Sequence, residues 1–328
     1  MPLSEFDLIE RYFRGCGVRR EDVELGVGDD AAVLECPPGQ RLVAAMDTLV
    51  EGVHFPRGCP PASVGHRALA VNLSDLAAMG ARPAWALLAL TLPEADEAWL
   101  AEFASGFAEL ARLHEVALVG GDTTRGPLCV TVQILGHLQG PALLRSGGQP
   151  GDALFVSGTP GDAAAGLALE QGRLPAPARA EYLRERFLYP TPRVALGSVL
   201  RGYADACIDV SDGLLGDAAK MAAASGCGAD IVYADLPVSQ ALLEAVGPER
   251  ARELALTGGD DYELCFSVRP GSLERLLTQL PPQRWGYTRI GTLRATPGTE
   301  VMRDGEPMAF AHAGYEHFVR GSEGGAHG

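Results

Sequence analysis

The sequence predicts an α+β protein of two domains, with strands and helices mixed in each. Apolar runs of strand length alternate with helix-length amphipathic segments, but without the regular repeat of a parallel α/β fold. Turn residues cluster once, over residues 136–150. With 328 residues and 47% hydrophobic content the chain can form two cores. We therefore expect an N-terminal domain over 1–138 and a C-terminal domain over 139–320.

The first half carries the clearer periodicity. Strands are expected over 42–47, 85–92, 116–119 and 128–137. Helices are expected over 63–80 and 94–114. The second helix has one apolar face, formed by Trp99, Phe103, Phe107 and Leu110. We interpret that face as core rather than as a ligand site.

The second half resumes the same mixture after the turn-rich junction. Strands are expected over 152–157, 206–210, 230–233 and 262–268, followed by a hairpin that turns at Asp304-Gly305. Helices are expected over 161–171, 192–203 and 212–225, the last capped by Ser211 or Asp212. Residues 321–328 have the composition of a disordered tail.

Charge and composition exclude several classes of protein. A formal net charge of −15 disfavours nucleic acid and anionic membranes as partners, because their phosphates would be repelled. No basic segment followed by an apolar core opens the chain, and no run of eighteen apolar residues follows, so we expect neither a signal peptide nor a membrane span. The seven cysteines never form CxxC and indicate reduced thiols. The expected location is the cytoplasm.

Aspartates recur where apolar runs meet glycines or turns. The segments are Gly28-Asp29-Asp30, Met46-Asp47-Thr48, Asn72-Leu73-Ser74-Asp75, Gly120-Gly121-Asp122-Thr123, Asp209-Val210-Ser211-Asp212-Gly213 and Gly258-Gly259-Asp260-Asp261. If these segments converge, their like charges cannot all remain ionised unless cations join them. Carboxylate oxygens suit Mg²⁺ or Ca²⁺.

Each segment alone allows a structural interpretation. Asp75 shares a helix face with Asn72 and is either a metal ligand or bonded to a neighbouring loop. Asp122 follows two glycines that indicate a turn. That turn either binds phosphate through its backbone N–H groups or has no ligand. Residues 209–213 either place metal ligands on one face and bind a phosphate at the start of the following helix, or they only cap that helix. A lone His54 or Arg145 is usually structural or a surface charge.

Lysine usage narrows the chemistry further. Lys220 is the only lysine in the sequence, and no glycine loop precedes it. A P-loop, the strand lysine of protein kinases and a lysine Schiff base are therefore not expected. If the protein handles phosphates, metal ions and arginines must neutralise them.

Taken in order, these segments together with Gly314-Tyr315-Glu316-His317-Phe318 resemble the thiamine-monophosphate kinase family. The match runs from near Phe6 to Phe318. That family belongs to the superfamily of aminoimidazole ribonucleotide synthetase, whose members use ATP without a P-loop. The resemblance implies an N-terminal domain that pairs in a homodimer through strand contacts, and an α+β C-terminal domain.

The resemblance also implies a reaction. ATP would phosphorylate thiamine monophosphate to thiamine diphosphate, the last step of thiamine diphosphate biosynthesis. A phosphate monoester has a second pKa near 6, so the acceptor oxygen is already an anion and needs no general base. The obstacle is repulsion between two polyanions, which several Mg²⁺ ions would relieve during direct in-line transfer.

Residue roles follow by position from the same resemblance. The implied metal ligands are Asp30, Met46 through its backbone carbonyl, Asp47, Asp75, Asp122, Asp209 and Asp212. Of these, the catalytic set is Asp122, Asp209 and Asp212. The implied ATP contacts are Gly121, Asp122, Arg145 and Ser211. The implied contacts to thiamine monophosphate are His54, Asp260 and Tyr315.

Two departures and two alternatives accompany this assignment. Relatives often carry hydroxyl residues where Ala45-Met46 stand, and can carry Glu where Asp260 stands, which shortens its reach. The enzymatic alternative is an aminoimidazole ribonucleotide synthetase-like ligase, which would activate an amide oxygen. The other alternative is a non-catalytic sensor of Mg²⁺ and nucleotide.

Overall fold

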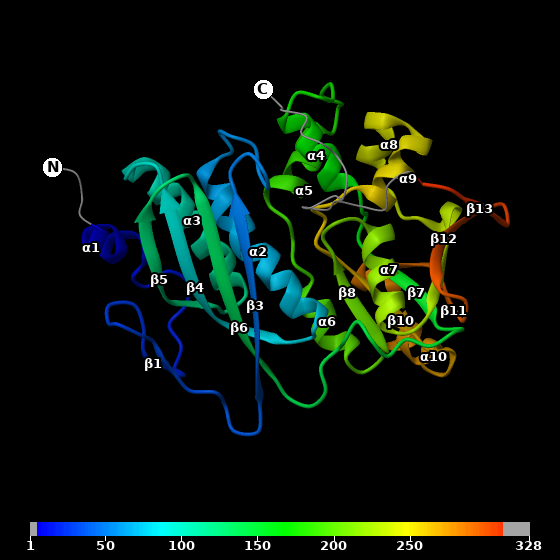
Figure 1. Cartoon of the computed structure of the whole chain (residues 1–328), viewed down its shortest axis with the longest axis horizontal. Helices are drawn as coiled ribbons and strands as arrows, with labels where there is room; N and C mark the ends of the chain where they lie inside the picture. The colour runs from blue at the N-terminus through cyan, green and yellow to red at the C-terminus, as the bar shows by residue number, and fades with distance from the viewer. Residues whose placement is uncertain (1–4, 311–328) are drawn as a thin grey trace.

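The structure, a computed structural model, describes residues 5–310. It contains a four-stranded and a seven-stranded sheet, each packed against helices, with a small two-stranded ribbon at the N-terminal end (Figure 1). Both halves mix strands with helices, so the predicted α+β class is confirmed. The predicted tail at 321–328 lies outside the described residues. The boundary after residue 138 stays a prediction.

The N-terminal sheet has the strand order β3-β6-β4-β5. Its strands are β3 (Arg41–Val50), β4 (Arg82–Leu92), β5 (Ala117–Arg125) and β6 (Cys129–Leu138). The β4–β5 pair is parallel, whereas β6 pairs antiparallel with both β3 and β4. Val130, Val132 and Ile134 alternate into the core, as predicted. Before this sheet come α1 (Glu5–Leu8), the π-helix η1 (Ile9–Phe13), β1 (Val23–Leu25) and β2 (Val33–Leu34).

Two long helices, α2 (Pro61–Ala78) and α3 (Glu97–Leu113), cover one face of this sheet and lie behind it in Figure 1. Phe103 and Phe107 are fully buried, so the apolar face of α3 is core as predicted. The two helices approach closely through glycines. A Cβ on Gly106 would lie 1.9 Å from the carbonyl oxygen of Ala62, so this contact tolerates no side chain.

The predicted turn at residues 120–124 is wrong. The strand expected over 116–119 continues as β5 to Arg125, and Asp122 lies inside it opposite Ala89 of β4. A Cβ on Gly121 would stand 1.8 Å from the carbonyl oxygen of Leu88. The glycine is required by the close approach of β4, which sequence spacing alone does not distinguish from a turn.

The C-terminal sheet has the order β13-β12-β9-β11-β7-β10-β8. Its strands are β7 (Ala153–Ser157), β8 (Ala206–Val210), β9 (Gly228–Val232), β10 (Glu263–Val268), β11 (Tyr287–Arg294), β12 (Gly298–Arg303) and β13 (Glu306–Met308). The predicted hairpin at Asp304-Gly305 is confirmed, with φ of 51° and 87° at the two turn residues. Strand β11 was not predicted.

The helices of this half are only partly as expected. They are α4 (Asp162–Glu170), α5 (Ala180–Leu188), α6 (Val194–Leu200), α7 (Leu214–Ala224), α8 (Gln240–Val246), α9 (Pro248–Thr257), α10 (Pro270–Gln279) and α11 (Pro282–Trp285), with a 3₁₀ turn η2 (Tyr233–Asp235). Only α4, α6 and α7 were predicted. Helix α5 was missed because it is short and largely charged and buries only Ala180, Leu183 and Phe187.

Helix α2 joins the two halves, because it contacts α6 and β8 as well as its own sheet. The side of the N-terminal sheet opposite α2 and α3 stays exposed along β3, where Leu42 and Met46 are 53% and 64% accessible. Within residues 5–310, none of the helices is long and apolar enough to cross a lipid bilayer.

Candidate active site

Four of the predicted aspartates converge where α2, β3 and β8 meet. Asp47 lies on β3, Asp75 on α2, Asp209 on β8 and Asp212 in the bend after β8. Two side chains of α2 fix their neighbours. The amide oxygen of Asn72 accepts from the backbone N–H of Asp47 at 3.1 Å. The Ser74 hydroxyl donates to Asp209 Oδ2 at 2.9 Å.

Burial and mutual repulsion set the protonation of this cluster. Burial raises the pKa of Asp75 to about 8, and the charges of Asp209 and Asp47 add to the rise while Arg145 opposes it. Burial also raises the pKa of Asp209 to about 6, against the hydrogen bond from Ser74. The pKa of Asp47 is raised by burial and by the charge of Asp212. Burial and the neighbouring carboxylates thus both disfavour the charged form of these groups.

The donor set suits a divalent cation, although the side chains are not closed around one. Among residues 5–310, no three His, Cys, Asp or Glu side chains stand close enough to share an ion as they lie. The donors are carboxylate oxygens, which Mg²⁺ prefers, and a cation would offset both the burial and the mutual repulsion that raise their pKa values. In donor type and in charge, the residues of the cluster therefore fit Mg²⁺.

Two predicted carboxylate ligands lie on other elements than the four clustered aspartates, and a third predicted ligand is a backbone carbonyl. Asp30 is exposed in the turn between β1 and β2, where its backbone N–H donates to Asp29 Oδ1 at 2.8 Å. Asp122 is exposed on β5. Strands β6 and β4 lie between β5 and β3, so the sheet separates Asp122 from Asp47. That carbonyl belongs to Met46, which directly precedes Asp47 in β3, and the Met46 side chain points to the exposed face of the sheet.

The expected capping of α7 is wrong. Neither Ser211 nor Asp212 caps the helix. Instead, Asp217 Oδ2 accepts from the backbone N–H groups of Ser211, Asp212 and Gly213 at 3.0, 3.0 and 3.2 Å. These amides were the predicted phosphate cradle, and a carboxylate of the chain itself occupies them.

Of the predicted ATP contacts, Ser211 lies in this bend and Arg145 acts on the cluster, whereas Gly121 and Asp122 lie on β5. The charge of Arg145 acts on both Asp75 and Asp209 and lowers their pKa values, which places its guanidinium at the cluster. Its backbone carbonyl accepts from Ser225 Oγ at 3.0 Å. The carbonyl of Ser211 accepts from the backbone N–H of Asp260 at 2.8 Å, so the segments that carry these two residues are directly bonded.

Asp260 is already paired within the protein. Its carboxylate forms an ion pair with Arg67 of α2, whose side chain is only 3% exposed. Arg67 also donates to the carbonyl of Phe187 at 2.7 Å and lies 4.4 Å from the centroid of its ring. Both Asp260 and Tyr262 have positive φ, 72° and 51°. The buried pair offsets the cost of this backbone conformation and neutralises much of the Asp260 charge.

His54 lies in the loop that follows β3, and Tyr315 lies outside the described residues. The His54 ring accepts from the backbone N–H of Val50 through Nδ1 at 3.0 Å, so the neutral ring carries its proton on Nε2. The same loop reaches Cys59, whose thiol interacts electrostatically with Arg67. His54 and Asp260 therefore belong to segments that approach one another around Arg67.

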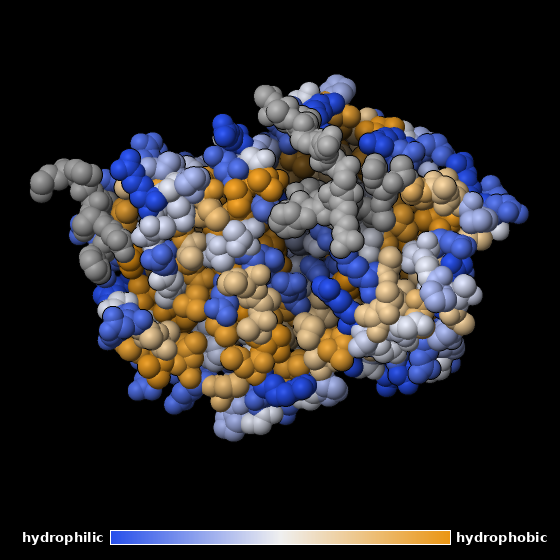
Figure 2. All heavy atoms as spheres, in the orientation of Figure 1, coloured by the Kyte–Doolittle hydropathy of each residue, from blue (hydrophilic) through white to orange (hydrophobic). Residues whose placement is uncertain are grey.

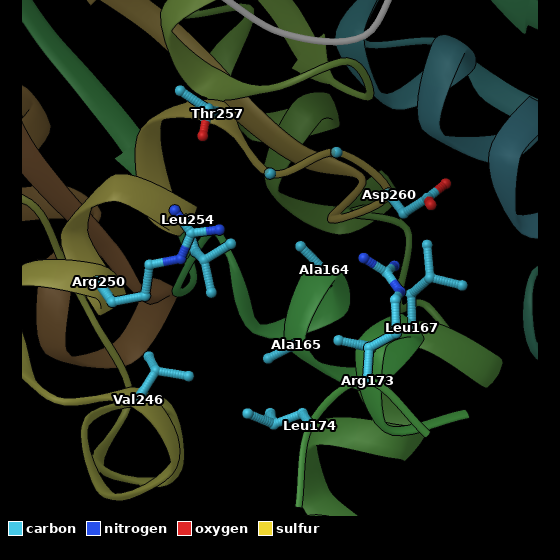
Figure 3. A pocket seen from close by; sticks show the side chains of 13 residues that line it. Ala164, Ala165, Leu167, Arg173, Leu174, Val246, Arg250, Leu254, Thr257 and Asp260 are labelled. Carbon is cyan, nitrogen blue, oxygen red and sulfur yellow. The ribbon is translucent and has the colours of Figure 1, made fainter. Parts of the chain in front are cut away.

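A cavity of about 440 Å³ lies between α4 and α9, and Asp260 forms part of its wall (Figure 3). Leu167, Leu174, Val246 and Leu254 supply apolar surface, and Arg173 and Arg250 supply positive charge. Asp260 therefore belongs both to the ion pair with Arg67 and to the wall of this cavity in the C-terminal half.

Four residues with clear roles in this arrangement escaped sequence reasoning: Arg67, Ser74, Asp217 and Lys220. Arg67 and Asp217 bond with residues or amides that only the fold brings near. Ser74 carried a signal, since it stands next to Asp75 on a buried helix where an unpaired hydroxyl is unfavourable. For Lys220, the sequence was used only to exclude a P-loop, a kinase strand lysine and a Schiff base.

Two family models match the chain. The one described as AIR synthase related protein, N-terminal domain, covers residues 28–138, and the one described as AIR synthase related protein, C-terminal domain, covers residues 149–304. The protein is therefore of the AIR synthase related class, with both domains present.

Full-length relatives narrow the class. The chain is 50% identical to the thiamine-monophosphate kinase of Escherichia coli strain K12, over 97% of this chain and 99% of that one. The crystal structure of thiamine-monophosphate kinase from Stenotrophomonas maltophilia K279a is 49% identical with a TM-score of 0.82, over 94% of this chain and 99% of that one. The chain belongs to the thiamine-monophosphate kinase family, so the resemblance of the motifs is confirmed.

A third comparison concerns ligands. A solved structure described as AaThiL complexed with AMPPCP and TMP is 33% identical with a TM-score of 0.75, over 96% of this chain and 97% of that one.

Proposed function

We propose that this chain transfers the γ-phosphoryl group of ATP to thiamine monophosphate, giving thiamine diphosphate and ADP. The observation that carries the proposal is the convergence of Asp47, Asp75, Asp209 and Asp212 where α2, β3 and β8 meet, in a chain whose family has this activity. A relative binds AMPPCP and TMP together, which supports ATP and thiamine monophosphate as the two substrates.

Mg²⁺ ions held by the cluster would neutralise the phosphates and align them for in-line transfer. The proposed ligands are Asp30, the Met46 carbonyl, Asp47, Asp75, Asp122, Asp209 and Asp212, with Asp122, Asp209 and Asp212 as the catalytic set. Asn72 bonds to the backbone N–H of Asp47, and Ser74 bonds to the carboxylate of Asp209. Because the acceptor phosphate is already an anion at neutral pH, no residue of the chain has to remove a proton from it.

The nucleotide contacts are proposed for Gly121, Asp122, Arg145 and Ser211. Arg145 is the one with a clear electrostatic role, since its guanidinium already acts on Asp75 and Asp209. In a chain without a P-loop lysine, that guanidinium supplies fixed positive charge beside the phosphates.

For the acceptor, the proposed contacts are His54, Asp260 and Tyr315. The ion pair with Arg67 supports a particular role for Asp260. Because Arg67 pairs with its carboxylate, Asp260 offers a fixed hydrogen-bond acceptor rather than a free counter-charge to the thiazolium ring. His54 would act through Nε2, since Nδ1 accepts from the chain itself.

We also propose that the protein works as a cytoplasmic homodimer. The uncovered face of the N-terminal sheet exposes Leu42 and Met46, and apolar surface gathers over this sheet in Figure 2. Exposed apolar patches on one face of a sheet are typical of protein interfaces. A second copy laid on this face would cover it, and the solution mass tests this directly.

The deciding experiment incubates the protein with ATP, Mg²⁺ and thiamine monophosphate, with unphosphorylated thiamine in parallel, and separates the products by chromatography. We expect thiamine diphosphate from the monophosphate only, and only with Mg²⁺. Asp122→Asn and Asp212→Asn should each abolish turnover with the fold intact, whereas the exposed Asp235→Asn should not.

The alternatives predict different outcomes of the same experiment. ATP consumption only with an amide substrate would favour a ligase of the aminoimidazole ribonucleotide synthetase type. Nucleotide binding without any product would favour a sensor. Normal rates in both Asp122→Asn and Asp212→Asn would refute the proposed metal ligands.

A further inference from the structure

The only lysine of the chain, Lys220, lies at the proposed metal site. Its Nζ stands 2.5 Å from Asp212 Oδ2 and 2.9 Å from Asp217 Oδ1. Asp212 is one of the four clustered carboxylates and a proposed ligand of Mg²⁺. The Lys220 ammonium therefore already pairs with a carboxylate oxygen that a bound Mg²⁺ ion would need as a ligand.

The second partner of Lys220 is fixed independently. Asp217 is almost fully buried, and its other oxygen accepts the three backbone N–H groups of residues 211–213. These three bonds hold Asp217 in place whatever happens at Asp212. The ammonium can consequently leave Asp212 and still keep a charged partner.

We propose that Lys220 is a resident cation that competes with Mg²⁺ for Asp212 and withdraws to Asp217 when the metal binds. Lys220 and Asp217 would then be positioning residues that set the metal affinity of Asp212. The inference depends on the proposed function, because only there is Asp212 a metal ligand.

The geometry predicts opposite changes in Mg²⁺ affinity when Lys220 and Asp217 are replaced one at a time. Lys220→Met removes the competitor and leaves the amide bonds of Asp217 intact, so Mg²⁺ should bind more tightly. Asp217→Asn keeps an oxygen for the three amides but removes the second carboxylate, so the ammonium pairs with Asp212 alone and Mg²⁺ should bind more weakly. Two residues with merely structural roles would both weaken binding.

The test is calorimetric titration of the whole protein with MgCl₂ in the absence of nucleotide. Because the Lys220 and Asp212 side chains are 46% and 37% exposed, the change expected is that of a solvent-screened ion pair. We expect affinity to rise about twofold to fivefold in Lys220→Met and to fall by a similar factor in Asp217→Asn. Arg303→Met removes an exposed cation that pairs with Glu249 in the C-terminal half, and should leave the affinity unchanged.

Unchanged or weaker binding in Lys220→Met would overturn the proposal, as would unchanged or tighter binding in Asp217→Asn. Asp212→Asn separates this inference from the proposed function. If Asp212→Asn leaves Mg²⁺ affinity unaltered, Asp212 is not a ligand and the metal assignment fails. If Asp212→Asn weakens binding but Lys220→Met does not strengthen it, only the competition is refuted.

Discussion

Replacing Asp75 by Asn should stabilise the metal-free protein, although it removes a proposed metal ligand. Asp75 is partly buried on α2 beside Asp209 and Asp47, and its pKa is raised to about 8 by that burial and by those charges. At neutral pH folding therefore has to keep this carboxyl protonated or accept a buried charge. Asn fills nearly the same space without that cost.

The sign and size follow from the pKa shift. The folded-state pKa lies above the ordinary value of 3.8, so the folded chain binds this proton more tightly than the unfolded chain. The stability that the proton contributes is complete below pH about 4 and is lost progressively as the pH rises to about 8. At pH 7 the loss is about 4 kcal/mol at most, and partial access of water reduces it to roughly 2 kcal/mol.

The assay is thermal unfolding in EDTA at pH 5 and pH 7.5. At pH 7.5, Asp75→Asn should melt roughly 3 °C above the unaltered chain, and the difference should shrink at pH 5. The exposed Asp235→Asn should show no such difference. Adding Mg²⁺ should stabilise the unaltered chain more than the variant. Equal melting temperatures in EDTA at both pH values would refute the argument.

Two further predictions concern packing. Arg67→Met should destabilise by about 3 kcal/mol, because it leaves the Asp260 carboxylate without its buried partner, whereas Arg82→Met removes an exposed ion pair and should cost under about 1 kcal/mol. Urea unfolding of both variants checks this, and equal midpoints would contradict it. Gly106→Ala should destabilise by about 2 kcal/mol or more through overlap with α2, whereas Gly271→Ala meets open space in α10 and should be neutral or slightly stabilising. Melting temperatures that move in the same direction would count against the close approach of the helices.

Sequence reasoning succeeded where local periodicity is strong. The alternation of Val130, Val132 and Ile134 and the aromatic face of α3 identify a strand and a helix without knowledge of their neighbours. It failed at Gly121, because a glycine before Asp122 looks the same in a turn and in a strand crowded by a neighbouring carbonyl. Charged helices such as α5 also escaped, since tertiary contacts rather than pattern stabilise them.

For the site, the sequence indicated which carboxylates matter but not which ones meet. Asp47, Asp75 and Asp209 come from three separate elements, and their convergence depends on how α2 packs against β3 and β8. The partners that hold them were harder still to predict. Asp217 reads as an ordinary helical acid until its bonds to three backbone amides are visible. The metal roles of all these aspartates, Asp30 and Asp122 included, stay predictions.

Helix α2 places strict limits on insertions and deletions. Arg67, Asn72, Ser74 and Asp75 lie on it within nine positions; Arg67 pairs with Asp260, and the other three interact with β3 and β8. One inserted residue turns everything beyond it by about 100°. An insertion after Arg67 would therefore swing the other three side chains away from β3 and β8 together. An insertion in the loop between α4 and α5 does not rotate a helix face in this way. Length variation among relatives should therefore be more common in that loop than in α2.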